Sequence, residues 1–167
     1  MTPTILDNFL SEDFFKHIQS VMFSEDFHWF YMDNIDYLDD VDKFQFTHAF
    51  YHQDSGPQSD HFKMWDFLFH TVKAKEIFNI KANLLTRTSK IVVNTFHTDR
   101  RSFQPGKNMT SIMYMNSNNG YTEFEDGTIV ESVANRFISF PCGMKHRGTS
   151  CTDKKVRIVV NFNYIME

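Results

Sequence analysis

Two short segments of this chain place an imidazole and a carboxylate two residues apart: His52-Gln53-Asp54 and His97-Thr98-Asp99. Alternate residues of a β-strand point to the same side, so either segment could present both groups to one metal ion. With eight His residues among 167, chance alone gives about one such triplet. The residues that follow each triplet must therefore decide which of them does chemistry.

The first triplet leads directly into Ser55-Gly56-Pro57, which is typical of a turn or of the end of a strand. The next two His residues, His61 and His70, lie in a segment whose pattern predicts a helix. We therefore interpret His52 and Asp54 as a surface pair.

The second triplet ends a predicted strand over 91–96 and enters a loop that contains Pro105-Gly106. Only one His follows it, His146, which lies 49 residues further on. That separation suits a ligand that arrives from a strand on the far side of the same barrel. Two His and one carboxylate, with further positions left open, are typical of non-haem Fe(II) sites.

A basic residue stands near the start of an apolar predicted strand, VRIVVNFNY (156–164). Alternation gives this strand one apolar face, made of Ile158, Val160, Phe162 and Tyr164. The other face carries Arg157, Val159, Asn161 and Asn163, and it must line either solvent or a pocket. A guanidinium directed into a pocket would bind a carboxylate through two parallel hydrogen bonds, whereas the alternative is a solvated strand arginine.

The elements that would position these residues change character along the chain. Apolar stripes at helical spacing predict helices from Ser11 to about residue 22 and over about 60–72. From residue 80 onward, short segments rich in Val, Ile, Phe, Tyr and Thr alternate with turn signals. The expected fold class is α+β, mainly β, with an antiparallel sandwich or barrel. We expect one domain over 1–167, with a helical or mixed support region (1–79) and a β-roll core (80–167).

Composition excludes several classes of function. The net charge is −4, the isoelectric point is near 6.0, and no Lys/Arg-rich run appears, so no nucleic-acid partner is expected. The N-terminus lacks a signal-peptide pattern, and no apolar stretch approaches the roughly 18 residues of a membrane span. Cys142 and Cys151 are expected to be reduced thiols rather than a catalytic pair with His146. We expect a cytoplasmic protein, either a monomer or a homodimer, with no membrane association.

Several segments, in this order, resemble the Fe(II)/2-oxoglutarate-dependent dioxygenases, and in particular the prolyl-4-hydroxylase-like group. The segments that carry the resemblance are HTD (97–99), SIMYMN (111–116), GTIVESVANRFISFP (127–141), KHRGTSC (145–151) and VRIVVNFNY (156–164). The resemblance covers residues from about 80 to 164. It implies a double-stranded β-helix core, of the jelly-roll or cupin-like kind, with the N-terminal helices packed on one sheet.

The resemblance also implies roles for single residues. His97, Asp99 and His146 would be the catalytic Fe(II) ligands, and Arg157 would bind the distal carboxylate of 2-oxoglutarate. Three further residues would contribute to the cosubstrate pocket: Tyr114 through its hydroxyl, Asn161 on the face of Arg157, and Asn83 on a neighbouring strand. Relatives that have an Asn at the position of Asn83 often carry a Tyr two residues later, where this chain has Leu85.

The activity implied is hydroxylation of a C–H bond with O2 and 2-oxoglutarate as cosubstrates and with release of succinate and CO2. The substrate would be peptidyl, with prolyl as the family default, or a small amino-acid-like molecule. The carboxylate of Asp99 favours hydroxylation, because halogenating relatives have a small residue there. Arg100, Arg101 and Lys107 would overhang the mouth and attract an acidic substrate, or else are solvated loop charges.

Two other interpretations remain open on the sequence alone. A cupin-type metal-binding β-barrel would share the three metal ligands but would have no need of Arg157. A non-enzymatic β-roll that serves as a binding module would make His97-Thr98-Asp99 a coincidence.

Overall fold

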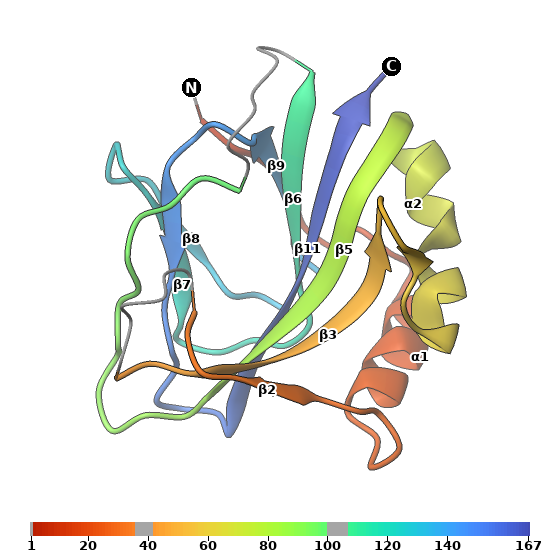
Figure 1. The fold of residues 1–167 in the computed structure, drawn as a ribbon. Coiled ribbons are helices and arrows are strands. Elements are labelled where there is room, and N and C mark those ends of the chain that lie inside the picture. Colours follow the sequence, from red (N-terminus) through yellow and green to blue (C-terminus); the bar gives the residue numbers. More distant parts are fainter. Residues whose placement is uncertain (1, 36–41, 100–106) are drawn as a thin grey trace.

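An antiparallel sheet of eight strands forms the larger layer of the molecule (Figure 1). The computed structural model describes residues 2–35, 42–99 and 107–167. In this part of the chain the strands follow the order β1-β9-β6-β11-β5-β3-β2, and β4 pairs with β3 outside that path. Their bounds are β1 Thr4–Leu6, β2 Phe30–Met32, β3 Gln45–His52, β4 Gly56–Pro57, β5 Ala74–Thr86, β6 Asn108–Tyr114, β9 Phe137–Pro141 and β11 Val156–Met166.

A smaller antiparallel sheet faces the large one across the middle of the molecule (Figure 1). Its strands are β7 (Tyr121–Phe124), β8 (Ile129–Glu131) and β10 (His146–Gly148), in the order β10-β7-β8. Residues of both sheets line a common pocket. The described chain is therefore mainly β, with the pocket between its two sheets.

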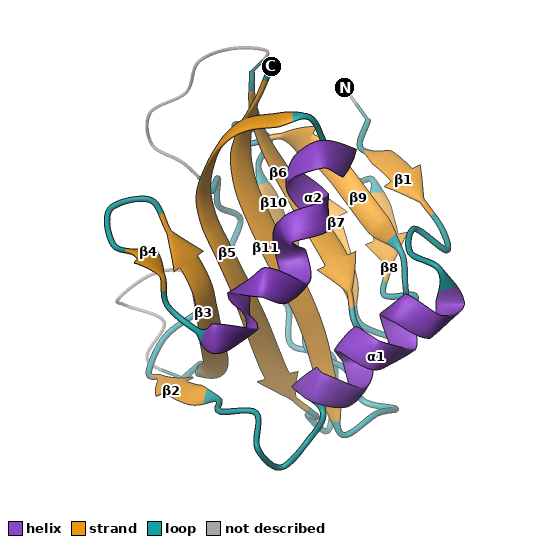
Figure 2. Cartoon of the chain, turned by 90° about the vertical axis from the view of Figure 1, so that its right-hand side faces the viewer, coloured by secondary structure: helices purple, strands orange, loops and turns teal. Residues whose placement is uncertain are grey.

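The helices pack on the outer face of the large sheet (Figure 2). α1 (Glu12–Met22) begins after Ser11, as the sequence predicts, and buries Phe15, Ile18 and Met22. The helix predicted over 60–72 is a 3-10 turn (Asp60–Trp65) followed by α2 (Asp66–Thr71). No helix in the described ranges is long and apolar enough to cross a membrane.

Alternation along β11 divides its side chains between the helix layer and the pocket. Ile158, Val160, Phe162 and Tyr164 belong to the core beneath the helices. Phe162, for example, meets Trp65 edge to face, with ring centroids 5.2 Å apart. The opposite face carries Arg157, Val159 and Asn161 into the pocket. The two faces predicted for this strand are confirmed.

Two boundaries differ from the sequence prediction. The first 79 residues are more than a support region, because β3 and the first half of β5 are strands of the large sheet. The predicted strand over 91–96 is wrong, since this segment forms only isolated bridges, at Val93 with Thr149 and at His97 with His146. The segment faces the short strand β10, which forms its continuous ladder with β7 on its other side.

Candidate metal and anion site

The metal site begins with a backbone pair between two distant histidines. The backbone N–H of His97 donates to the carbonyl of His146 (2.9 Å), and the N–H of His146 donates to the carbonyl of His97 (3.0 Å). Residues that exchange both hydrogen bonds lie directly opposite each other, and the two ring centroids are 4.6 Å apart. The sequence separation of these residues suggested opposite sides of a barrel, and that expectation is wrong because they are immediate neighbours.

Three potential ligand atoms converge beside this pair. Oδ1 of Asp99 lies 3.5 Å from Nε2 of His97 and 3.6 Å from Nε2 of His146. His97, Asp99 and His146 each offer one ligand atom within 4.8 Å of the others, and no other group of three in the described chain does so. The three residues predicted as ligands are therefore together in space and could hold a metal ion.

The hydrogen bonds of the two rings suit metal coordination through Nε2. Nδ1 of His146 lies 3.0 Å from the carbonyl oxygen of Met144, and Nδ1 of His97 lies 3.4 Å from that of Thr95. A carbonyl only accepts, so each Nδ1 carries the proton in these contacts. The neutral rings then present the Nε2 lone pair toward Asp99, which is the tautomer that a metal needs.

Asp99 is held by neutral donors on its second oxygen. The hydroxyl of Thr110 (2.7 Å) and the side-chain amide of Asn163 (3.0 Å) both donate to Oδ2. Burial raises the pKa of Asp99, but the imidazoles of His97 and His146, in their protonated form, and the hydroxyl of Thr110 outweigh it, and the net pKa lies well below its usual value. The carboxylate is ionised at neutral pH, as a metal ligand must be.

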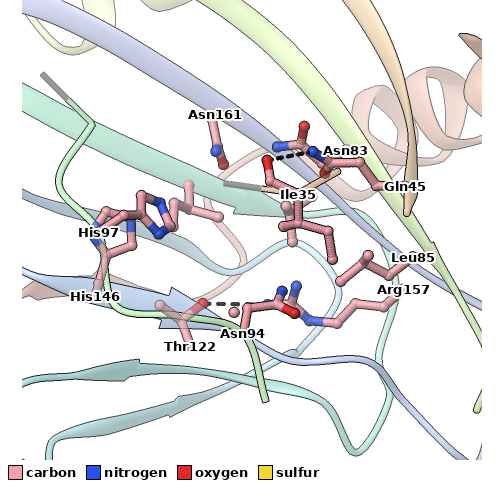
Figure 3. Close-up of a pocket in the computed structure, with 13 residues that line it drawn as sticks. Ile35, Gln45, Asn83, Leu85, Asn94, His97, Thr122, His146, Arg157 and Asn161 are labelled. Atoms are coloured by element: carbon pink, nitrogen blue, oxygen red, sulfur yellow. Dashed lines mark hydrogen bonds between the residues drawn. The ribbon is translucent and has the colours of Figure 1, made fainter. Parts of the chain in front are cut away.

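A pocket that is partly open to solvent extends from the two histidines into the space between the sheets. Figure 3 shows His97 and His146 at one end, Arg157 at the other, and Asn161 and Asn83 on the wall between them. The residues that line it are Ile35, Gln45, Asn83, Leu85, Asn94, His97, Ile112, Thr122, His146, Gly148, Arg157, Val159 and Asn161.

Arg157 is a buried cation at the far end of this pocket, only 4% exposed. Its Nε donates to the hydroxyl of Ser132 (2.8 Å), and its Nη2 donates to that of Thr122 (3.3 Å). No carboxylate of the described residues lies within 4.0 Å of the guanidinium, and burial lowers its pKa. A buried guanidinium without a counter-charge is costly, so this end of the pocket is suited to an anion.

Two glycines make room around the guanidinium. A Cβ on Gly120 would lie 2.7 Å from Cδ of Arg157 and 2.7 Å from the carbonyl oxygen of Ser150, so only glycine fits there. A Cβ on Gly148 would lie 3.5 Å from Nη1 of Arg157 and 4.0 Å from Nδ2 of Asn94. The space above Gly148 is therefore bordered by two nitrogen donors, which is a cradle that one carboxylate oxygen could occupy.

Two buried amide oxygens lie along the pocket wall. Oδ1 of Asn83 and Oδ1 of Asn161 are inaccessible to solvent and have no hydrogen-bond partner among the described residues. Buried polar atoms are nearly always paired, so these two indicate a ligand or ordered water in the pocket. An amide offers both a donor and an acceptor, and it can pair with a carboxylate or with water.

Tyr114 does not line the pocket directly. Its fully buried hydroxyl donates to Oγ1 of Thr122 (2.8 Å), which also accepts from Arg157. Two acceptor sites of the Thr122 hydroxyl are then occupied, and its own hydrogen is left to point elsewhere. The hydroxyl of Tyr114 thus lies behind Thr122, which does line the pocket, and its role in cosubstrate binding stays a prediction.

Several residues of the site were not identified from the sequence. Asn163 shares the polar face of Arg157, so alternation did offer a signal for it. Thr110, Thr122, Ser132 and Asn94 gave none. The N-terminal region also contributes, because Nε2 of the buried Gln45 donates to the carbonyl of Ile35 (3.0 Å), and both residues line the pocket.

The other triplet is a surface pair, as predicted. His52 closes β3, and its Nδ1 lies 3.7 Å from Oδ2 of Asp54, with both side chains at least half exposed. The described chain supplies no third ligand there. Of the basic residues expected at the mouth, Lys107 is exposed, while Arg100 and Arg101 lie outside the described residues.

Comparison with known proteins finds similarity in fold but not in sequence. No protein-family model and no curated protein sequence matches this chain. Solved structures do match it. A prolyl-4-hydroxylase of Pseudomonas putida has a TM-score of 0.65 at 13% identity, over 99% of this chain and 92% of its own.

Two further structures show the same likeness. A 2OG-Fe(II) oxygenase family oxidoreductase of Burkholderia pseudomallei has a TM-score of 0.67 at 10% identity, over 98% of this chain and 84% of its own. A viral collagen prolyl hydroxylase from Paramecium bursaria Chlorella virus-1 has a TM-score of 0.59 at 12% identity, over 100% of this chain and 97% of its own. The chain therefore has the fold of the 2-oxoglutarate and Fe(II) oxygenases, and the resemblance found in the sequence is confirmed at the level of fold.

Proposed function

We propose that this chain is an Fe(II)- and 2-oxoglutarate-dependent oxygenase, built on a double-stranded β-helix, that hydroxylates a C–H bond. The substrate class is a peptide, with a prolyl residue as one candidate, or a small amino-acid-like molecule. The observation that carries the proposal is the buried Arg157, which no carboxylate of the described residues contacts, in the same pocket as a His-Asp-His group. A metal site alone would not require that cation.

The donor set fits Fe(II). Two neutral imidazoles and one carboxylate on one side of an ion are the ligands that non-haem Fe(II) oxygenases use, with the remaining positions open. His97, Asp99 and His146 would hold the metal through Nε2, Oδ1 and Nε2. Bound Fe(II) and 2-oxoglutarate would together supply oxidative decarboxylation by O2, which yields succinate, CO2 and a hydroxylated product.

The rest of the pocket fits a dicarboxylate. Arg157 would neutralise the carboxylate that lies far from the metal, and Thr122 would add its unused hydroxyl hydrogen. Leu85, Ile112 and Val159 form apolar walls that exclude water and strengthen this charge-assisted contact. Asn83 and Asn161 would meet the polar atoms in between.

Solved structures with this fold differ in the reaction that they catalyse and in their substrates. Proteins of this fold include a carbocyclase and an epimerase from nogalamycin biosynthesis, besides prolyl hydroxylases. One solved relative, from Trichoplax adhaerens, is described as a prolyl hydroxylase in complex with a peptide fragment. We favour hydroxylation over halogenation because Asp99 supplies the carboxylate ligand.

A first experiment tests cosubstrate chemistry without knowledge of the substrate. The purified chain is mixed anaerobically with Fe(II) and 2-oxoglutarate, and the weak visible charge-transfer band of a chelated keto acid is recorded. Succinate release is then measured in air across a panel of peptides and free amino acids. The band together with slow succinate release supports the proposal.

Other outcomes identify the alternatives. Metal binding without the band would favour a cupin-type protein with chemistry independent of 2-oxoglutarate. Absence of both metal binding and the band would favour a non-enzymatic binding module.

A further inference from the structure

The two oxygens of the Asp99 carboxylate have different surroundings. Oδ1 lies within 3.6 Å of both histidine Nε2 atoms, whereas Oδ2 accepts the hydrogen bonds of Thr110 and Asn163. Thr110 and Asn163 stand opposite each other on the adjacent strands β6 and β11. The large sheet thus reaches one oxygen of a carboxylate that belongs to the segment after His97.

The three side chains form a closed set of hydrogen bonds. The amide Nδ2 of Asn163 donates to Oδ2 of Asp99 (3.0 Å) and also to Oγ1 of Thr110 (3.0 Å). Because Thr110 accepts from that amide, its hydroxyl hydrogen is directed to Oδ2 of Asp99, at 2.7 Å. The amide of Asn163 and the hydroxyl of Thr110 both donate to Oδ2, so the arrangement has a single polarity.

Both donors are neutral. A lysine or arginine at either position would offset the charge of Asp99 and weaken its attraction for a cation. An amide and a hydroxyl satisfy Oδ2 without removing that charge. The carboxylate can therefore remain fixed in orientation and still contribute a full negative charge through Oδ1.

We propose that Thr110 and Asn163 are positioning residues that restrict Asp99 to coordination through Oδ1 alone. The proposal rests on the proposed metal site. With Oδ2 engaged, the protein supplies three ligand atoms instead of four, and the positions for a chelating cosubstrate and O2 stay open. A purely structural role, compensation for the burial of an ionised carboxylate, would affect folding but not metal affinity.

The test measures metal affinity with Co(II), by absorption titration of the full-length chain, and the unfolding temperature of each variant. Thr110→Val and Asn163→Leu each remove a donor to Oδ2 at similar volume. Each should weaken Co(II) binding by about 10- to 100-fold, the range typical of lost outer-shell partners. The Co(II) absorption intensity should also change, because both oxygens of Asp99 can then coordinate.

Matched control variants distinguish an effect on the position of Asp99 from an effect on the stability of the fold. Thr110→Ser keeps the hydroxyl and should retain Co(II) affinity within about threefold. Ser111→Ala removes a neighbouring buried hydroxyl that bonds Ser139 and Tyr164 instead, and it should leave Co(II) affinity unchanged. If Asn163→Leu fails to fold, Asn163→Ala replaces it, because it also removes the donor and is smaller.

The outcomes are distinct. The metal site stands if wild type binds Co(II) and Asp99→Ala does not. In that case the inference alone is overturned if both donor variants bind Co(II) as wild type does while unfolding at lower temperature. If Asp99→Ala binds Co(II) as tightly as wild type, the proposed metal site is wrong and the inference fails with it.

Discussion

His97 and His146 are joined through their backbones, each N–H donating to the carbonyl of the other at 2.9 and 3.0 Å. The two imidazoles therefore start from directly opposed positions, and strand pairing rather than side-chain packing sets the distance between them. Because main-chain atoms make this link, either ring can be removed without breaking it.

We expect His97→Ala to lose metal affinity while keeping the fold. Removal of one of three ligands should weaken Co(II) binding by about 100-fold or more. This is at least as large as the greatest loss of affinity typical of a substitution in the outer shell. The unfolding temperature should change little, because the pairing with His146 is retained. Absorption titration and circular dichroism measure the two effects. His52→Ala serves as the control, and equal Co(II) affinity in His97→Ala and wild type would show that the metal site is misplaced.

Arg157→Met should separate cosubstrate binding from metal binding. The variant removes a buried charged donor pair, and each charged hydrogen bond contributes about 1.5–3 kcal/mol. The affinity for 2-oxoglutarate should therefore fall by about 100-fold, while Co(II) affinity stays close to that of wild type. The affinity of Arg157→Lys for 2-oxoglutarate should lie between those of wild type and Arg157→Met, because an ammonium keeps the charge but lacks the planar fork of a guanidinium.

Calorimetric titration of 2-oxoglutarate into the metal-loaded chain provides this measurement. If Arg157→Met binds the keto acid as tightly as wild type does, the role assigned to this arginine is wrong.

Gly120 and Gly148 should respond differently to the same substitution. Gly120→Ala places a Cβ 2.7 Å from the carbonyl oxygen of Ser150, and such overpacking costs about 1–3 kcal/mol of unfolding free energy. Gly148→Ala makes only ordinary contacts with protein atoms, so stability should be nearly unchanged. Its methyl group enters the space bordered by Arg157 and Asn94, and 2-oxoglutarate affinity should fall about tenfold.

Denaturant unfolding and ligand titration of both variants test this contrast. Equal losses of stability in the two variants, or undiminished 2-oxoglutarate affinity in Gly148→Ala, would contradict the proposed carboxylate cradle.

Folding stability should fall in mild acid because of His48. Nδ1 of this buried ring contacts the carbonyl of His28 (2.7 Å), so Nε2 accepts from the hydroxyl of Ser59 (2.8 Å). Burial lowers the pKa of His48 below its usual value of 6.5, and it outweighs the hydrogen bond to the carbonyl of His28, which acts in the opposite direction. The unfolded chain then binds more protons, so the stabilisation is present above pH 6.5 and is lost as the pH falls below it.

The unfolding temperature measured between pH 7.5 and 5 checks this sign. His48→Gln cannot titrate and should show a shallower decline over the same interval. An equally steep decline in both proteins would assign the pH dependence to other groups.

The local pattern of the sequence predicted the roles of whole elements. Alternation along β11 identified its core face and its polar face, because side chains of a strand point to opposite sides whatever the strand pairs with. The spacing of apolar residues located both helices, because residues three and four apart lie on one face of a helix whatever that face packs against. The residue types of His97, Asp99, His146 and Arg157, in their order, were enough to indicate a metal and a carboxylate ligand.

The tertiary structure alone decided how these residues meet. The pairing of His97 with His146 and the contact of Asn163 with Asp99 join segments far apart in the chain. The position of Tyr114 behind Thr122 and the contact of Thr110 with Asp99 join neighbouring segments, but they too depend on how the strands pair. Such contacts depend on strand register, which long-range packing selects, and a shift of one residue would turn every side chain to the other face. Local periodicity thus determines which residues face a pocket, whereas register determines which of them touch.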